Sequence, residues 1–435
     1  MKKHSVLLRD DKCEGCTNCV KNCPTKAIRV HQGKASIREQ LCIDCAECIR
    51  TCEYHAKYTE TAELEVLKDY SRPVALVPPS FYGQFGKKAK PALVSAALRE
   101  LGFSAVYDAA LAAEAVSRET ARFLSENSGF YISSSCPVVV RLIKLLYPEL
   151  INYLIPIKSP VELMAQYILE EQSEADVVFI TPCPAKLTAV ENPPGQEKSF
   201  LSTAVAVDKV YPRVLDMIKN RDISAQDEKN NIPFLGIGWG RRGGEEKILR
   251  RKQQDKVVSV AGIHNVKNLL EEISRENISG VKYFELVSCP QGCVGGVLNV
   301  RNPYQARFDI KRMATGQKEL QVDSRINFDF SLDRKFSADE AGKLDDDIGK
   351  AMEKLTRLEE VKNSLPGLDC AACGAPDCET LAEDIVNGLA DRTDCIFMLR
   401  KEVSDLADRI SSLTHVLPPV MSEEKEDQDE TETDN

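Results

Sequence analysis

The chain has 435 residues, 43% of them hydrophobic and 29% charged, a balance typical of folded proteins in a chain too long for one ordinary core. Its formal net charge is −10, most of it in the acidic stretch from Glu423 to Asn435, so no basic surface indicates nucleic-acid binding. No apolar run is long enough to span a membrane, and the N-terminus lacks a secretory signal. We therefore expect a cytoplasmic protein that binds neither nucleic acid nor a membrane.

The number and spacing of the cysteines are the strongest indication of function in this sequence. Sixteen cysteines in a chain without a secretion signal indicate metal or redox sites rather than disulfides. Only five histidines occur, and none forms an H-E-x-x-H pattern, so zinc hydrolase chemistry is unsupported.

Two cysteine runs with the spacing C-x2-C-x2-C-x3-C lie within residues 1–60. Such a loop wraps three corners of an iron–sulfur cubane, and the fourth thiolate comes from the other run. The repeat predicts an α+β ferredoxin-like domain with two [4Fe–4S] clusters, and it resembles bacterial two-cluster ferredoxins; a zinc module is the alternative. The first cluster is expected on Cys13, Cys16, Cys19 and Cys52, and the second on Cys42, Cys45, Cys48 and Cys23.

Four sparse cysteines follow in the middle of the chain, mostly just after apolar runs typical of β-strands. Strand ends are where open α/β sheets carry their sites. A competing G-x-G-x-x-G pattern (Gly238, Gly240, Gly243) lacks the ribose-binding acid and βαβ context of a dinucleotide site. The four residues are Cys136, Cys183, Cys289 and Cys293.

The last cysteine group has the spacing C-x2-C-x4-C-x16-C, which predicts a third accessory [4Fe–4S] cluster, with structural zinc as the alternative. Its members are Cys370, Cys373, Cys378 and Cys395. We expect a linking helix over 336–364 and a small helical four-cysteine domain over 365–396.

An apolar residue recurs at alternating intervals of three and four over residues 396–417. This heptad stripe, largely β-branched at a and leucine at d, predicts a short coiled-coil helix that contacts a second copy or a signalling partner. Packing against its own domain is the alternative. Residues 418–435 are expected to be a disordered acidic tail.

The contexts SSSCP, TPCPAK and SCPQGCVGG resemble the three signatures of [FeFe]-hydrogenases, over about residues 73–310. The resemblance implies an H-cluster domain over 73–330, built as an α/β fold of two parallel-sheet lobes. It also implies an H-cluster, in which a [4Fe–4S] cubane joins a diiron subcluster carrying CO, CN and a dithiolate bridge. The implied ligands are Cys136, Cys183, Cys289 and Cys293, with Cys293 bridging to the diiron unit.

The resemblance assigns roles to the neighbours of these cysteines. The Lys186 ammonium would bind one cyanide, since a buried cation stabilises an anionic acceptor. Backbone N–H groups near Pro79 and Ser80 would bind the other, and Gly292 would allow close backbone approach. Fast members carry a proton-relaying cysteine where this chain has Ser135, whose hydroxyl is a far weaker acid. The outer relay glutamates of the family fall on Thr120, Phe123 and Ala189.

A site that keeps its metal ligands and loses its usual proton relay predicts slow, reversible H2 oxidation and proton reduction in a sensory-type member. An ordinary ferredoxin-linked catalytic hydrogenase and a non-catalytic iron–sulfur protein without diiron are the alternatives. The expected partners are H2 and protons, ferredoxin or another redox protein, and hydrogenase maturation proteins.

Overall fold

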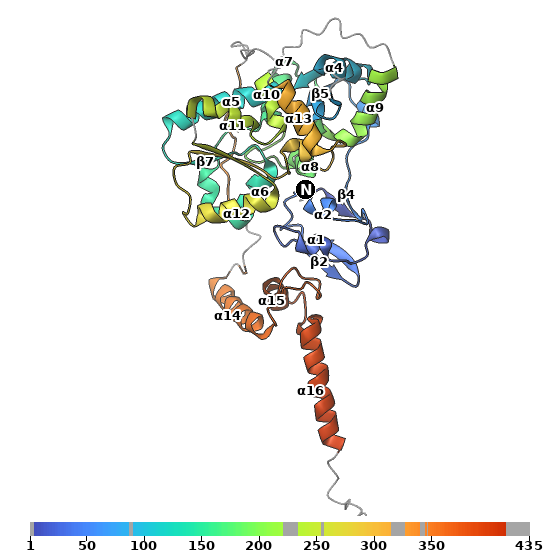
Figure 1. Ribbon diagram of the computed structural model, residues 1–435, viewed down its shortest axis with the longest axis vertical. Coiled ribbons are helices and arrows are strands. Elements are labelled where there is room, and N and C mark those ends of the chain that lie inside the picture. The colour runs from blue at the N-terminus through green and yellow to red at the C-terminus, as the bar shows by residue number, and fades with distance from the viewer. Residues whose placement is uncertain are drawn as a thin grey trace, which may run out of the picture. The chain divides into compact units, whose positions relative to one another are not determined.

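The computed structural model describes residues 4–86, 90–220, 234–253, 256–314, 327–339, 344–345 and 347–414 (Figure 1). It divides into two compact units, Met1–Lys343 and Leu344–Asn435, which we describe separately. Every helix in the described residues is too short or too polar to cross a membrane.

The first sixty residues form a small α+β module with an internal repeat. The two antiparallel strand pairs and the two short helices recur at matching places in the two cysteine runs. The backbone repeats as well: Thr17 and Ala46, which follow equivalent cysteines, both have positive φ. The elements are β1 (Val6–Leu8) paired with β4 (Lys57–Thr59), β2 (Ile28–His31) paired with β3 (Lys34–Ile37), α1 (Asn18–Lys21) and α2 (Glu47–Arg50).

The first lobe of the larger domain is a four-stranded parallel sheet in the order β6-β5-β8-β9. Its central strands are continuous runs of buried apolar residues, as expected for a parallel sheet covered on both faces. Its strands are β5 (Pro73–Val77), β6 (Ala105–Asp108), β8 (Asp176–Thr181) and β9 (Thr203–Ala206).

The second lobe is a three-stranded parallel sheet in the order β10-β11-β7. Its strands are β7 (Tyr131–Ile132), β10 (Val257–Ala261) and β11 (Tyr283–Val287). The predicted pair of parallel-sheet lobes is therefore confirmed.

Helices connect the parallel strands, because parallel pairing requires a long crossover. The longest is α5, whose alanine-rich face is buried in the core. The helices are α3 (Pro79–Tyr82), α4 (Pro91–Glu100), α5 (Ala109–Glu126), α6 (Pro137–Leu146), α7 (Pro160–Glu171), α8 (Pro184–Glu191), α9 (Val207–Asn220), α10 (Phe234–Ile237), α11 (Gly244–Gln253), α12 (Ile263–Ser274) and α13 (Pro303–Met313).

One buried carboxylate, Asp44, joins the ferredoxin-like module to the larger domain. Its side chain is 0% exposed and forms an ion pair of 2.9 Å with Arg141 on α6. It also accepts hydrogen bonds from the backbone N–H of Ser5 and, at 2.6 Å, from the Thr188 hydroxyl on α8. Because α6 and α8 each begin next to a cysteine of the middle group, this contact fixes the module against the elements that carry the central site.

The linking helix begins later than predicted. Residues 336–339 are not helical, and in the described part of the predicted range the helix α14 covers only Ile348–Ser364. The segment that ends at Asp339 is instead held against the larger domain by ion pairs, from Lys158 to Asp329 (2.8 Å) and from Lys144 to Asp339 (2.9 Å).

The C-terminal unit is helical. It contains α14, α15 (Cys378–Val386) and α16 (Ile396–Thr414), and a small core forms between α14, α15 and the cysteine loop. The apolar stripe of α16 is exposed along its length. The last residue of the heptad pattern, Leu417, and the predicted tail over 418–435 lie outside the described residues.

Replacing Asp44 tests the contact between the modules. Asp44→Ala leaves the Arg141 guanidinium without its carboxylate, and breaking a buried pair costs about 3–5 kcal/mol; because Arg141 is partly exposed, we expect the lower end. The measurement is the melting temperature of the anaerobic protein, which should fall by several degrees. Glu63→Ala, which removes a pair exposed on both sides, is the matched control and should change it little. An equal effect of both variants would contradict a structural role for Asp44.

Candidate metal centre

The four middle cysteines line one cavity of about 110 Å³ between the two sheets of the larger domain. Cys136 follows β7, Cys183 follows β8, and Cys289 and Cys293 follow β11. Their convergence results from the fold, because parallel strands present their carboxyl ends at the same edge.

Two helices present their N-terminal ends at this cavity. Cys136 is the N-cap of α6 and Cys183 the N-cap of α8, and in both helices proline occupies the first position. Proline suits that position because its missing N–H is not needed there. The partial positive charge of a helix N-terminus favours an anion beside it. The Cys-Pro sequence therefore starts each helix at the cysteine and places this positive end beside the cysteine sulfur.

Burial dominates the titration of these thiols. Desolvation raises the pKa of Cys183 to about 11 and that of Cys293 to about 12, while the Lys186 ammonium opposes both shifts. Desolvation also raises the pKa of Cys289 well above its usual value. Thiolates are the metal-binding form, so metal binding here must displace protons.

The cavity wall carries polar atoms whose partners are missing among the described residues. The hydroxyls of Ser80 and Ser288 are buried without a hydrogen-bond partner. The half-buried Lys186 has no hydrogen bond or ion pair to any described residue, and its Nζ lies 5.8 Å from the Phe179 ring centroid. Donors and a cation aimed into a thiol-lined cavity fit an anionic iron–sulfur group with polar ligands.

Glycines bring the backbone close to the cavity. Gly292 has φ +94°, and a Cβ on it would lie 2.4 Å from the Arg242 nitrogen. A Cβ on Gly240 would lie 2.9 Å from the Ser80 nitrogen at the start of α3. The glycine at position 240 therefore allows this segment to pack closely against the backbone of Ser80.

A buried acid network in the same cavity was not predicted from the sequence. Glu245 on α11 accepts hydrogen bonds from the Tyr283 hydroxyl (2.9 Å) and from Ser133 (3.3 Å). Burial, and then the charge of Glu285, raise the pKa of Glu245 to about 8. Burial likewise raises the pKa of Glu285 to about 7, although two backbone N–H groups donate to its carboxylate. A glutamate inside the apolar strand YFELV was the sequence signal that could have revealed it.

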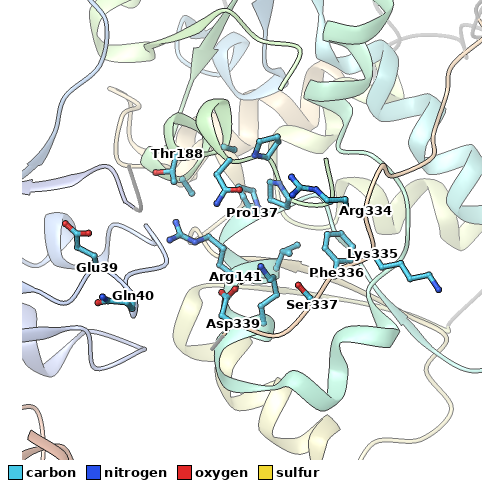
Figure 2. A pocket seen from close by; sticks show the side chains of 18 residues that line it. Glu39, Gln40, Pro137, Arg141, Thr188, Arg334, Lys335, Phe336, Ser337 and Asp339 are labelled. Carbon is cyan, nitrogen blue, oxygen red and sulfur yellow. Dashed lines mark ion pairs between the residues drawn. The ribbon is translucent and has the colours of Figure 1, made fainter. Parts of the chain in front are cut away.

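Ser135 lies between two adjoining cavities. It lines the metal cavity and, with Lys186, a smaller adjoining cavity of about 20 Å³ that also contains Glu162. The smaller cavity shares Pro137 and Phe336 with a larger one of about 560 Å³. Figure 2 shows the larger cavity, with Glu39 and Gln40 of the ferredoxin-like module on one side and Arg334 and Phe336 on the other.

The predicted outer relay positions carry no acid. Thr120 is buried, and its hydroxyl has no hydrogen-bond partner among the described residues. Phe123 packs on the core, and Ala189 lines the two outer cavities. Glu162, which lines the cavity next to Ser135 and Lys186, accepts hydrogen bonds from Ser199 and the Phe200 N–H, and burial raises its pKa.

The eight cysteines of the ferredoxin-like module line two separate cavities. Each cavity collects three cysteines from one run and the last cysteine of the other. Cys45 lines both the second of these cavities and the metal cavity of the larger domain. The two sets are Cys13, Cys16, Cys19 and Cys52, and Cys23, Cys42, Cys45 and Cys48.

In the C-terminal unit, Cys373, Cys378 and Cys395 meet in the small core beside α14 and α15. Cys370 is exposed. Burial raises the pKa of Cys373, and the charges of Cys395 and Cys370 raise it further. The loop that carries Cys370 has positive φ at Asp369 and Ala371.

The fold and its cysteine sites define a multicluster iron–sulfur protein. Family models agree: one for a 4Fe-4S dicluster domain matches residues 5–53, and one for an Fe-S cluster matches residues 365–397. The model of the iron only hydrogenase large subunit, C-terminal domain, matches residues 71–234 and 239–297, about half of the chain. The chain belongs to the iron-only hydrogenase family, which confirms the resemblance seen in the sequence.

Individual relatives are distant. A glutamate-to-alanine variant of the [FeFe]-hydrogenase HydA1 of Chlamydomonas reinhardtii is 16% identical with a TM-score of 0.43, over 57% of this chain and 87% of that one. A second such variant of the same enzyme is 17% identical with a TM-score of 0.44, over 55% and 83%. The uncharacterized protein MJ0119 of Methanocaldococcus jannaschii is 29% identical over 72 residues, 17% of this chain and 32% of that protein. The chain thus matches about a third of that relative's length.

The protonated state of Glu245 predicts a pH-dependent stability. Because its pKa is raised on folding, the folded chain holds more protons than the unfolded chain, and stability falls as pH rises from about 4.5 to about 8. One such group contributes up to about 1.4 kcal/mol per pH unit. Glu245→Gln keeps the shape of the protonated acid without the titration, so its melting temperature should fall less steeply between pH 5 and pH 8.

The exposed Glu126→Gln serves as control and should retain the slope of the unaltered chain. Infrared spectroscopy gives a second readout, since a neutral carboxyl band present at pH 6.5 should be lost in Glu245→Gln. Identical slopes and bands in the two variants would show that Glu245 is ionised.

Proposed function

We propose that this chain is an [FeFe]-hydrogenase-type protein with an H-cluster, slow and reversible in H2 oxidation and proton reduction, and with a role in sensing H2 or redox state. The observation that carries the proposal is the cavity of four thiols with an unpaired ammonium and two unpartnered hydroxyls among the described residues.

Each cysteine group holds one cluster in this proposal. The three accessory [4Fe–4S] clusters use the two mixed sets of the ferredoxin-like module and the four cysteines of the C-terminal unit. Cys136, Cys183, Cys289 and Cys293 would hold the central cubane, and Cys293 would also be a ligand of the diiron subcluster. Bound there, the H-cluster supplies the metal chemistry that splits or forms H2.

The residues around the cavity bind and orient this group. The Lys186 ammonium and the backbone N–H of Ser80, next to Pro79, would donate to its anionic ligands, and Gly292, next to Cys293, lets two backbone segments pack closely. A cation in a site of low dielectric stabilises an anion more strongly than it does in water.

Proton supply limits the rate in this proposal. Ser135 is a poor relay, because a hydroxyl does not ionise near neutral pH, whereas the carboxyls of Glu245 and Glu285 titrate there. The hydrogen-bonded group of Ser133, Tyr283 and Glu245 holds a proton at the cavity wall. In this proposal, that group supplies protons slowly to the central site in place of the usual relay.

Cys23, Cys42, Cys45 and Cys48 would hold the cluster next to the central cavity, and that cluster would supply the electron exchange with the central site. Cys45 borders both cavities, and the Arg50 side chain donates to the carbonyl of Gly295, two residues after Cys293. A ferredoxin or another redox protein supplies or receives the electrons in this scheme, and hydrogenase maturation proteins deliver the diiron unit.

Two other functions remain as alternatives. An ordinary catalytic hydrogenase requires an efficient proton path, for which the acid network is the candidate. A non-catalytic iron–sulfur protein without diiron leaves Lys186 unpaired. The presence of a diiron unit would exclude the non-catalytic iron–sulfur protein. The turnover rate would then distinguish an ordinary catalytic hydrogenase from the slow hydrogenase proposed here.

An infrared spectrum of anaerobic protein matured with the diiron cofactor, taken before and after H2, tests the proposal. We expect CO and CN bands that shift under H2, with turnover slowed by about 10²–10⁴-fold relative to a member that has the complete relay. Ser135→Cys should restore little of this, since the outer relay positions lack acids. Normal cubane signals without CO or CN bands would favour the non-catalytic alternative, and fast turnover the ordinary hydrogenase.

We further propose that α16 pairs with a second copy of the chain. Six a and d residues between Ile396 and Leu413 are 43–67% exposed, an unusually continuous apolar stripe for an exposed helix. Leu406→Glu places a charge in this stripe and should convert a dimer to a monomer in sedimentation velocity, whereas Ser404→Glu, on the polar face, should leave the dimer intact. A monomeric unaltered chain at tens of micromolar would refute pairing between copies.

A further inference from the structure

The ferredoxin-like module contains a buried lysine without a partner in the described part of the chain. Lys57 is 3% exposed, and its Nζ is buried with no hydrogen bond to the described residues. Burying an ammonium is costly unless an opposite charge lies nearby. The described carboxylates form no ion pair with it.

The internal repeat shows that the lysine is not needed for the backbone. Ile28, the first residue of β2, and Lys57, the first residue of β4, stand at the same offset from the last cysteine of their runs. Both are buried, at 2% and 3% exposure. The fold therefore accepts an aliphatic side chain at this position, and the ammonium in the second repeat requires another explanation.

Lys57 acts electrostatically on both cysteine sets. It lines the cavity formed by Cys13, Cys16, Cys19 and Cys52. Burial raises the pKa of Cys19 to about 11 and that of Cys48 to about 12, and the Lys57 charge opposes both shifts. Cys19 belongs to the first set and Cys48 to the second, so one cation is within range of both.

We propose that the Lys57 ammonium raises the reduction potential of both [4Fe–4S] clusters in the ferredoxin-like module. Reduction of a cluster adds one electron and thus one negative charge, without breaking or forming a bond. A fixed cation in a site shielded from water stabilises the more negative, reduced state. The inference depends on the two clusters of this module and not on H2 chemistry at the central site.

The test is an EPR-monitored redox titration of the full chain, with dithionite as the reductant and the iron content measured in parallel. In Lys57→Met, the potentials of the magnetically interacting cluster pair should become more negative by at least a tenfold change in the reduction equilibrium, about 59 mV for one electron. Lys57→Arg should stay close to the unaltered chain.

Lys21→Met is the matched control. Lys21 lies between Cys19 and Cys23 on α1 but is exposed, so water and salt screen its charge and its removal should shift the potentials much less. Equal shifts in the Lys21 and Lys57 variants, or no shift in Lys57→Met at unchanged iron content, would overturn the proposal.

Loss of iron is also informative. If Lys57→Met and Lys57→Gln lose the clusters while Lys57→Arg retains them, the charge is needed to hold the anionic clusters, which supports the proposal. Loss of the clusters in Lys57→Arg as well would indicate a packing role and overturn it.

Discussion

The structure depends on the cost of burying negative charge. Thiolates that bind a metal must lose their protons, and burial alone opposes this at Cys183, Cys289 and Cys293. Three sources of positive charge stabilise the thiolates. They are the N-terminal ends of α6 and α8, the Lys186 ammonium, and the iron that the cysteines are arranged to hold. Without these, the thiols of Cys183, Cys289 and Cys293 would stay protonated.

The same constraint explains how the modules are joined. Asp44 is a buried carboxylate inside the loop of the second cysteine run, and two of its side-chain partners, Arg141 and Thr188, come from α6 and α8 of the larger domain. A carboxylate so placed is satisfied only when the two domains are docked. The position of the second ferredoxin-like cavity beside the central one thus follows from a hydrogen-bonding requirement as well as from apolar packing.

Much of the fold could be predicted from local patterns. The apolar runs before the Cys-Pro pairs placed the middle cysteines at strand ends, and the resemblance to [FeFe]-hydrogenases implied both parallel-sheet lobes and the convergence of Cys136, Cys183, Cys289 and Cys293. The acid network could not be predicted in this way, because Glu245 and Glu285 lie 40 residues apart and meet only through the pairing of β10 with β11 and the packing of α11. The linking helix was predicted to begin too early for a different reason. The segment through Asp339 has helix-forming residues, but its ion pairs to Lys158 and Lys144 hold it against the larger domain.

The acid network changes how the missing relay is understood. A hydroxyl at Ser135 removes an acid that titrates near neutral pH, yet the cavity does not lack such an acid, because burial moves Glu245 and Glu285 into that range. The two carboxyls repel each other when both are ionised, so the first proton is lost more readily than the second. In the proposed function, slow turnover therefore depends on how Glu245 and Glu285 are buried as well as on the serine at position 135.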